Sequence, residues 1–356
     1  MQYIIPALSA FVLTLLSVLI ALKFFPKIDL MDRPDKYGLN RKPIPYPGGI
    51  LLYFVFVALA LIFFDPTVKL IGLIVGGGLL VLVNFIDDRI NLPPWFRLIV
   101  QLTVALIMVG VGIGIETITN PFGGHIDLSQ LQLTIVIGTF SKTILLLSGL
   151  FTIAWILLIV NTMNWLDGIP GMTSGITVIG GLTLFFLSIS KIVNQPDVAM
   201  LALIIAMIAL AFWCFDFYPP KILMGDSGSM LLGLLLAVTA IFSGGKIATA
   251  FLILGFPILD ALYVITYRIL NKQAPWKGGE WDHQRKAVHL HHRLLHFGLS
   301  EKQALLVIYA LCATFGIIAL FLGTRGKFWA IIVIAFLSFM LGILLRAKGK
   351  KIDYLG

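Results

Sequence analysis

Long apolar runs, separated by short polar stretches, limit the fold of this chain more than any other feature. Eleven such runs can be traced along the 356 residues, at approximately 3–25, 49–64, 67–86, 95–115, 143–163, 171–190, 198–215, 226–243, 247–270, 303–323 and 327–346. A helix of about 20 apolar residues spans the hydrocarbon core of a bilayer, whereas strands of a membrane barrel alternate between apolar and polar residues. Because these runs are continuous, the sequence predicts an all-α, polytopic integral membrane helix bundle with about eleven transmembrane helices.

The composition excludes two other classes of protein. Only 12% of the residues are charged and 59% are hydrophobic. A soluble domain carries about 25% charged residues, so a soluble globular enzyme is excluded, as is a disordered chain. The net charge of +9 indicates contact with anionic lipid rather than nucleic acid, because no basic stretch is interleaved with exposed aromatic residues.

Lysine and arginine are shared unevenly between the two sides of the predicted bundle. With the N-terminus outside, twenty of the 26 fall on inner loops or inner span ends. Positive charge gathers on the cytoplasmic side of membrane proteins, so we expect the N-terminus outside and the C-terminus in the cytoplasm. No internal repeat divides the chain, which predicts one domain over residues 1–356. Its cytoplasmic loops would be 26–48, 87–94, 164–170, 216–225 and 271–302.

Acidic and amide residues gather at the inner ends of the predicted spans. Asp87 and Asp88 end the third span, and two adjacent acids with an apolar flank are costly to ionise. This cost favours a metal-binding role, a proton-accepting role or a cationic partner over simple solvation at the headgroups. Asn161, Asn164 and Asp167 recur at a spacing of three, so they share one helix face. Turn formation accounts for Asp167 but not for the two amides.

Two further acids lie at or inside spans. Asp226 opens the eighth span within the sequence Gly-Asp-Ser-Gly-Ser (225–229). The ordinary interpretation is a helix N-cap; the functional one is that a helix N-terminus attracts anions while a carboxylate there holds a hard cation. Asp260 lies within the ninth span. Because a carboxylate in lipid is costly, Asp260 is expected to face the bundle interior and to pair there.

Histidines form the densest polar feature of the chain, with His289, His291, His292 and the adjacent Arg293 in one inner loop. Zinc is the first interpretation of a histidine cluster. The basic neighbours fit a phosphate-bearing substrate better, and binding of lipid headgroups is the alternative.

A second basic inner loop reads Arg-Lys-Pro-Ile-Pro-Tyr-Pro-Gly-Gly (41–49), in which Arg41 and Lys42 either contact phosphate or serve as topological anchors. Acids, amides and a His–Arg loop on one face of a bundle indicate Mg²⁺-assisted phosphoryl transfer, since Mg²⁺ is usually held by one or two carboxylates plus substrate phosphates. A site on the inner face at the lipid boundary would meet a soluble diphosphate donor and a lipid acceptor.

Five motifs, in this order, resemble those of the polyprenyl-phosphate N-acetylhexosamine-1-phosphate transferases. They are Arg-Lys-Pro-Ile-Pro-x-Pro-Gly-Gly (41–49), Asp-Asp-Arg-x-x-Leu-Pro-Pro (87–94), Asn-x-x-Asn-x-x-Asp-Gly-x-x-Gly (161–171), Gly-Asp-Ser-Gly-Ser (225–229) and His-Leu-His-His-Arg-Leu-Leu (289–295). The histidine motif resembles that of the branch using UDP-N-acetylglucosamine (UDP-GlcNAc). The MurNAc-pentapeptide branch carries three consecutive histidines followed by an acidic position. Family members often carry Lys where this chain has Arg97.

The resemblance implies a multi-pass enzyme of the plasma (inner) membrane. It would transfer GlcNAc-1-phosphate from UDP-GlcNAc to undecaprenyl phosphate, releasing UMP and forming undecaprenyl-diphospho-GlcNAc. This is the first membrane step in the synthesis of cell-wall, teichoic-acid or O-antigen glycans. The resemblance also implies Mg²⁺, with Mn²⁺ as the alternative cation, and it admits a homodimer.

Roles for individual residues follow from the same resemblance. The implied catalytic residues are Asp87, which deprotonates or orients the lipid phosphate, Asp88, which assists near the metal, and His291. The implied metal ligands are Asp226 and its helper Asn164. The implied substrate-binding residues are Asn161, Asp167, His289, His292, Arg293, Arg41 and Lys42.

Several alternatives remain open. One-step attack by the lipid phosphate is favoured, and a phospho-aspartate on Asp87 or Asp88 is the rival mechanism. The donor could instead be UDP-MurNAc-pentapeptide or a UDP-linked 6-deoxy amino sugar. A polytopic lipid transporter is the alternative of a different class, and the small number of polar groups in the outer loops disfavours it.

Overall fold

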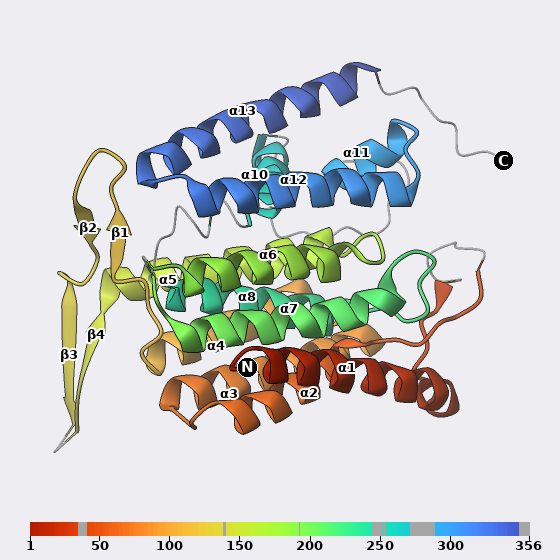
Figure 1. Cartoon of the computed structure of the whole chain (residues 1–356), viewed down its shortest axis with the longest axis horizontal. Coiled ribbons are helices and arrows are strands. Elements are labelled where there is room, and N and C mark those ends of the chain that lie inside the picture. The colour runs from red at the N-terminus through yellow and green to blue at the C-terminus, as the bar shows by residue number, and fades with distance from the viewer. Residues whose placement is uncertain are drawn as a thin grey trace.

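The computed structural model describes residues 1–34, 41–137, 140–191, 193–243, 251, 254–270 and 289–348. Its long helices lie side by side with roughly parallel axes, and two small β-hairpins project from one end of the bundle (Figure 1). The helices are α1 (Ile4–Phe24), α2 (Gly49–Phe63), α3 (Val68–Ile90), α4 (Pro94–Gly110), α5 (Leu146–Leu166), α6 (Met172–Ile189), α7 (Pro196–Asp216), α8 (Gly225–Phe242), α10 (Gly255–Leu270), α11 (Leu290–His296), α12 (Glu301–Phe321) and α13 (Thr324–Lys348), with a 3-10 turn at Phe25–Ile28. The prediction of a predominantly helical, polytopic membrane protein is confirmed.

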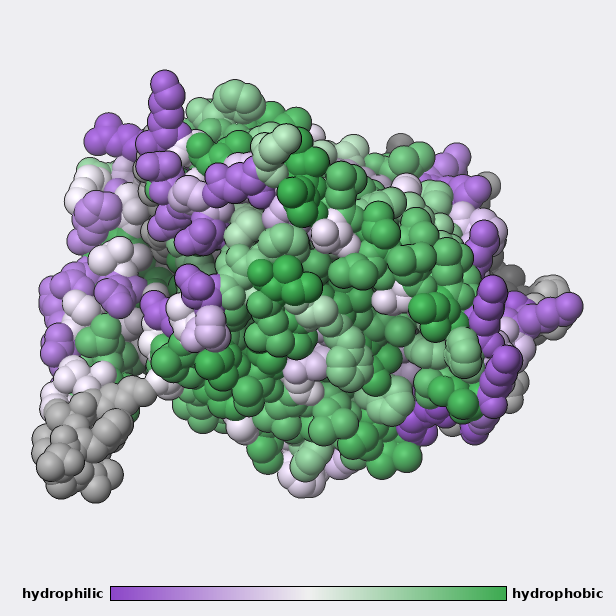
Figure 2. All heavy atoms as spheres, turned by 60° about the horizontal axis from the view of Figure 1, so that its bottom comes forward, coloured by the Kyte–Doolittle hydropathy of each residue, from purple (hydrophilic) through white to green (hydrophobic). Residues whose placement is uncertain are grey.

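Seven of the described helices are long and apolar enough to cross a membrane, and α2 and α4 are shorter apolar helices. On α1, small side chains such as Ala10 and Ala21 are buried while Leu16 and Ile20 are exposed, which is the reverse of a soluble helix. Figure 2 shows a broad band of apolar side chains across the molecule, with hydrophilic residues at both ends. An apolar surface of this extent is expected to contact lipid rather than water.

The hairpins are a feature that the sequence analysis did not predict. Strands β1 (Thr117–Thr119) and β2 (His125–Asp127) form one antiparallel pair, and β3 (Gln132–Ile137) and β4 (Phe140–Leu145) form another. The predicted span at 95–115 is cut short because α4 ends at Gly110 and the chain turns through Gly112, which has a φ of 84°. A connection taken as an outer loop therefore contains short strands.

Helix α8 lies at the centre of the bundle and contacts α2, α3, α5, α6 and α7. It is the most buried of the seven membrane-length helices, because 89% of its 18 residues are buried inside the protein. Its Gly233 faces the α5 backbone, where a Cβ would lie 3.1 Å from the Cα of Val160. Small residues let membrane helices approach closely. The N-terminus of α8 is thereby held among the ends of its neighbours, where the polar residues gather.

Candidate active site

Asp87 is held at the end of α3 by the turn that follows it. The helix ends at Ile90 because Asn91 adopts a left-handed backbone with φ 53°, and two prolines follow. The backbone N–H of Leu92 donates to Oδ1 of Asp87 at 2.6 Å. The turn thus satisfies one carboxylate oxygen and leaves Oδ2 to face the next helix.

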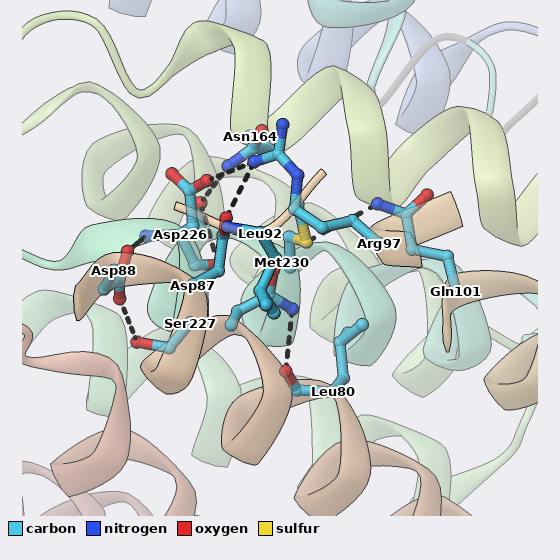
Figure 3. Close-up of polar contacts among 12 residues, drawn as sticks. Leu80, Asp87, Asp88, Leu92, Arg97, Gln101, Asn164, Asp226, Ser227 and Met230 are labelled. Atoms are coloured by element: carbon cyan, nitrogen blue, oxygen red, sulfur yellow. Dashed lines mark hydrogen bonds and ion pairs between the residues drawn. The ribbon is translucent and has the colours of Figure 1, made fainter. Parts of the chain in front are cut away.

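Arg97 joins two of the predicted acids. From the first turn of α4, its Nη1 lies 2.9 Å from Oδ2 of Asp87 and 3.0 Å from Oδ2 of Asp226 (Figure 3). The two carboxylates come from helices separated by more than a hundred residues of sequence. Arg97 therefore makes a central contact, because one guanidinium nitrogen binds both acids.

Asp88 points to different partners from its neighbour. Its Oδ1 accepts from the Tyr46 hydroxyl at 2.6 Å and from the backbone N–H of Asp226 at 3.1 Å. Its Oδ2 accepts from the Ser227 hydroxyl at 3.2 Å (Figure 3). Two acids adjacent in sequence thus hold the α8 N-terminus from two sides, Asp87 through Arg97 and Asp88 through direct hydrogen bonds.

The amides of α5 divide between two places. Asn164 donates to the Ser229 hydroxyl at 3.2 Å and also interacts with the Asp226 carboxylate. Asn161, one turn deeper, donates to Gln101 of α4 at 2.7 Å. Asn164 therefore belongs to the acidic group, whereas Asn161 ties α5 to α4 beneath it.

Asp167 follows the last residue of α5 and joins the acidic group through charge. Burial raises the pKa of this carboxyl well above its usual range, and the charges of Asp216, Asp226 and Asp88 raise it further. A carboxyl with a raised pKa holds a proton more readily. Asp167 is thus close enough to both predicted acidic motifs to sense their charge.

Asp216, at the end of α7, is a residue that the sequence analysis missed. It is 2% exposed and accepts from the backbone N–H of Gly171 at 3.0 Å and from the Ser174 hydroxyl at 2.8 Å. Tyr309 of α12 donates to the Gly171 carbonyl from the other side. These contacts fix the loop after Asp167. An acid at the end of an apolar span was the signal that could have identified Asp216.

The histidine motif packs against this same loop. His291 is fully buried, and its Nε2 lies 2.6 Å from the position a Cβ would take on Gly168. The rings of His291 and His292 lie 4.1 Å apart, and those of His289 and His291 lie 5.4 Å apart. Arg293 stacks over the Tyr263 ring at 4.1 Å. The motif therefore packs against Gly168, the residue that follows Asp167.

The basic residues of the 41–49 loop lie differently. Arg41 pairs with the buried Asp32 and also donates to the Lys42 carbonyl. Asp32 in turn accepts from the backbone N–H of Ile44 at 2.6 Å. Arg41 thus shapes its own loop, and Lys42 is exposed. Both remain predictions as phosphate contacts. The predicted loop at 271–302 lies outside the described residues over 271–288.

The histidines give a testable dependence of stability on pH. Burial, with the charges of His289 and His296, lowers the pKa of His292 to about 4. The unfolded chain binds this proton near the ordinary value of about 6.5, so stability is present above that pH and is lost as the pH falls toward 4. The loss from this one group is about 3 kcal/mol.

We expect His292→Gln to remove that part of the acid sensitivity. Thermal melts followed by tryptophan fluorescence at pH 7 and pH 4.5 should show a smaller difference for the variant than for the wild type. His125→Gln, on the exposed strand β2, is the control. Equal acid sensitivity of the wild type and His292→Gln would contradict the buried, neutral histidine.

The donor chemistry of the acidic group fits a magnesium ion. Asp87, Asp88 and Asp226 supply carboxylate oxygens and Asn164 an amide, which are ligands that hard cations prefer. In these contacts Arg97 pairs with two of the three carboxylates, those of Asp87 and Asp226. A divalent ion would supply the charge that remains unbalanced.

This bundle of membrane helices, with carboxylates, an arginine and a histidine motif at one end, defines a polytopic membrane protein with a phosphoryl-transfer type of site. The chain belongs to glycosyl transferase family 4, whose model matches residues 70–244. The resemblance seen in the motifs is confirmed.

Named relatives extend this similarity over most of the chain. A probable undecaprenyl-phosphate N-acetylglucosaminyl 1-phosphate transferase of Bacillus subtilis (strain 168) is 30% identical, over 96% of this chain and 91% of the relative. A decaprenyl-phosphate N-acetylglucosaminephosphotransferase of Mycolicibacterium smegmatis is 29% identical, over 78% and 71%. An undecaprenyl-phosphate alpha-N-acetylglucosaminyl 1-phosphate transferase of Escherichia coli (strain K12) is 25% identical, over 94% and 88%.

Proposed function

We propose that this protein transfers GlcNAc-1-phosphate from UDP-GlcNAc to undecaprenyl phosphate. The observation that carries the proposal is the contact of Arg97 with both Asp87 and Asp226, since it brings two motifs that are distant in sequence together beside one cation. The names of the relatives point to the same reaction. The alternative donors and the transporter hypothesis have no comparable support.

The reaction is a single displacement at phosphorus. An oxygen of the lipid phosphate bonds to the sugar-bearing phosphorus of UDP-GlcNAc, the diphosphate P–O bond breaks, and UMP leaves with the bonding electron pair. Asp87 orients the lipid phosphate, and Asp88 holds the α8 N-terminus and with it Asp226. His289, His291, His292 and Arg293 bind the sugar and diphosphate, and Asp167 lines the nucleotide pocket.

Repulsion between the two phosphates is the main barrier that the site must lower. We propose Mg²⁺ as the resident cation, with Mn²⁺ as the alternative, held by Asp226 with help from Asn164; when bound it neutralises the diphosphate charge. Arg97 supplies positive charge beside it. The amide of Asn161 and the basic residues Arg41 and Lys42 complete the proposed substrate contacts.

The membrane arrangement belongs to the same proposal. Eleven spans, an outer N-terminus and a cytoplasmic C-terminus place the acidic group on the cytoplasmic face of the plasma (inner) membrane, where UDP-sugars are available. All of residues 1–356 would then form a single domain, and a homodimer is compatible with this arrangement. The apolar band across the molecule and the seven membrane-length helices among the described residues support a multi-pass arrangement.

UMP release from the purified protein tests the proposal. With undecaprenyl phosphate and Mg²⁺, we expect UMP from UDP-GlcNAc and far less from UDP-MurNAc-pentapeptide or a UDP-linked 6-deoxy amino sugar. Preference for another donor would overturn the substrate, and lipid transport without UMP would overturn the class. UMP release without lipid, with label retained on the protein, would replace the single displacement by a phospho-aspartate mechanism.

A further inference from the structure

Asp260 makes polar contacts that tie α10 to the histidine motif. From within α10, its Oδ2 lies 2.7 Å from Nδ1 of His289, and its Oδ1 accepts from the backbone N–H of Leu290 at 2.8 Å. The Asp260 side chain is 5% exposed and the His289 side chain is 14% exposed. Both carboxylate oxygens are therefore engaged, in a place where an unpaired charge would be costly.

These contacts determine how the His289 ring is held. An ionised carboxylate only accepts hydrogen bonds, so Nδ1 of His289 must carry the hydrogen that it donates to Asp260. Nε2 is then left for another partner, which is the arrangement by which a carboxylate fixes the tautomer and orientation of a functional imidazole.

Asp260 also fixes the start of α11. His289 is the residue before this helix and makes no side-chain cap, and the first helical N–H, that of Leu290, is satisfied by Asp260 from another helix. One turn further along α10, Tyr263 stacks on Arg293 at the far end of the motif. Residues three apart share a helix face, so one face of α10 holds both ends of the motif.

We propose that Asp260 is a positioning residue of the active site, which holds His289 in the Nδ1–H tautomer with Nε2 available to substrate. This rests on the proposed function, in which His289 binds the sugar diphosphate. The rings of His289 and His291 are stacked with an angle of 17° between their planes, so the orientation of His289 also restricts that of His291.

Asp260→Asn is the decisive variant. An amide of nearly the same shape has one acceptor where the carboxylate has two, so it cannot serve both His289 and Leu290. We expect kcat for UMP release to fall about 10- to 100-fold, the usual cost of removing a partner that orients a histidine, with a smaller change in KM. Asp260→Glu should recover part of the loss. Thr266→Val, exposed on the same helix, is the matched control and should keep full activity.

The tautomer of His289 can be measured directly, and a purely structural role of Asp260 would not change it. The chain has six histidines, so ¹⁵N-histidine NMR of the full-length protein can follow each ring, and loss of one signal in His289→Gln assigns His289. We expect an Nδ1-protonated ring in the wild type and a changed ring signal in Asp260→Asn. Unchanged kcat or an unchanged His289 signal in Asp260→Asn would overturn the proposal.

Two other outcomes are informative. One ligand atom from each of Asp260, His289 and His291 lies within 4.8 Å of the others, a spacing that could hold a metal ion. If a zinc-selective chelator abolished wild-type activity and added zinc restored it, these residues would form a metal site. That result would overturn the hydrogen-bonded arrangement. Absence of UMP release from the wild type would refute the proposed function alone, and the NMR measurement would still decide the role of Asp260.

Discussion

Replacing Asp226 by Asn should abolish transfer while leaving the protein folded. Asp226 is the acid that Arg97 shares with Asp87, and its backbone N–H is held by Asp88. The substitution removes one negative charge from the place proposed to bind the cation and the diphosphate. Preorganised electrostatic groups of this kind contribute about 100- to 1,000-fold each. Because Asp226 is also the proposed metal ligand, we expect UMP release to fall about 1,000-fold.

The fold should tolerate the change. The Asp226 side chain is 34% exposed, and Arg97 keeps its contact with Asp87. The thermal melt of Asp226→Asn should therefore match that of Asp197→Asn, an exposed acid at the start of α7 that should retain full activity. Near-normal turnover of Asp226→Asn at saturating Mg²⁺ would remove Asp226 from the site and with it the proposed metal ligand.

Much of the candidate site could be predicted because polar residues are few in a sequence that faces lipid. Such residues must meet other polar groups inside the bundle. Asp87, Asn164, Asp226 and the histidines were identified for this reason. Asp260 was expected to pair inside the bundle, and it does so with His289.

The partners of these residues could not be predicted from the sequence. Which acid Arg97 would meet depends on how α3, α4 and α8 are placed around each other, and no local pattern encodes that. Asp216 acts on the backbone of Gly171, a contact that depends only on where two helix ends come together. The hairpins between α4 and α5 were missed because short strands of mixed polarity give little periodic signal.

The packing of the glycines in the 41–49 motif was also not predicted, because the sequence analysis considered only the basic residues of this motif. Gly48 and Gly49 donate backbone hydrogen bonds to the carbonyls of Leu223 and Met224, at 2.8 and 3.0 Å. A Cβ on Gly49 would lie 2.2 Å from the backbone nitrogen of Gly228, in the first turn of α8. The starts of α2 and α8 therefore touch backbone to backbone, directly beside Asp226.

Gly49→Ala should consequently displace the α8 N-terminus and the acid it carries. The obstructing atoms are backbone atoms and cannot rotate away, so overpacking should cost roughly 1–3 kcal/mol of stability. A shift of about 1 Å at a reacting group can cost about 100-fold in rate, and we expect UMP release to fall by about that factor, together with a lower melting temperature. Gly110→Ala, where a Cβ meets nothing within 4 Å, is the matched control and should behave as wild type. If Gly49→Ala kept full activity, α2 and α8 would have to be able to separate without moving Asp226, and the close contact between them would not be what sets the geometry of the site.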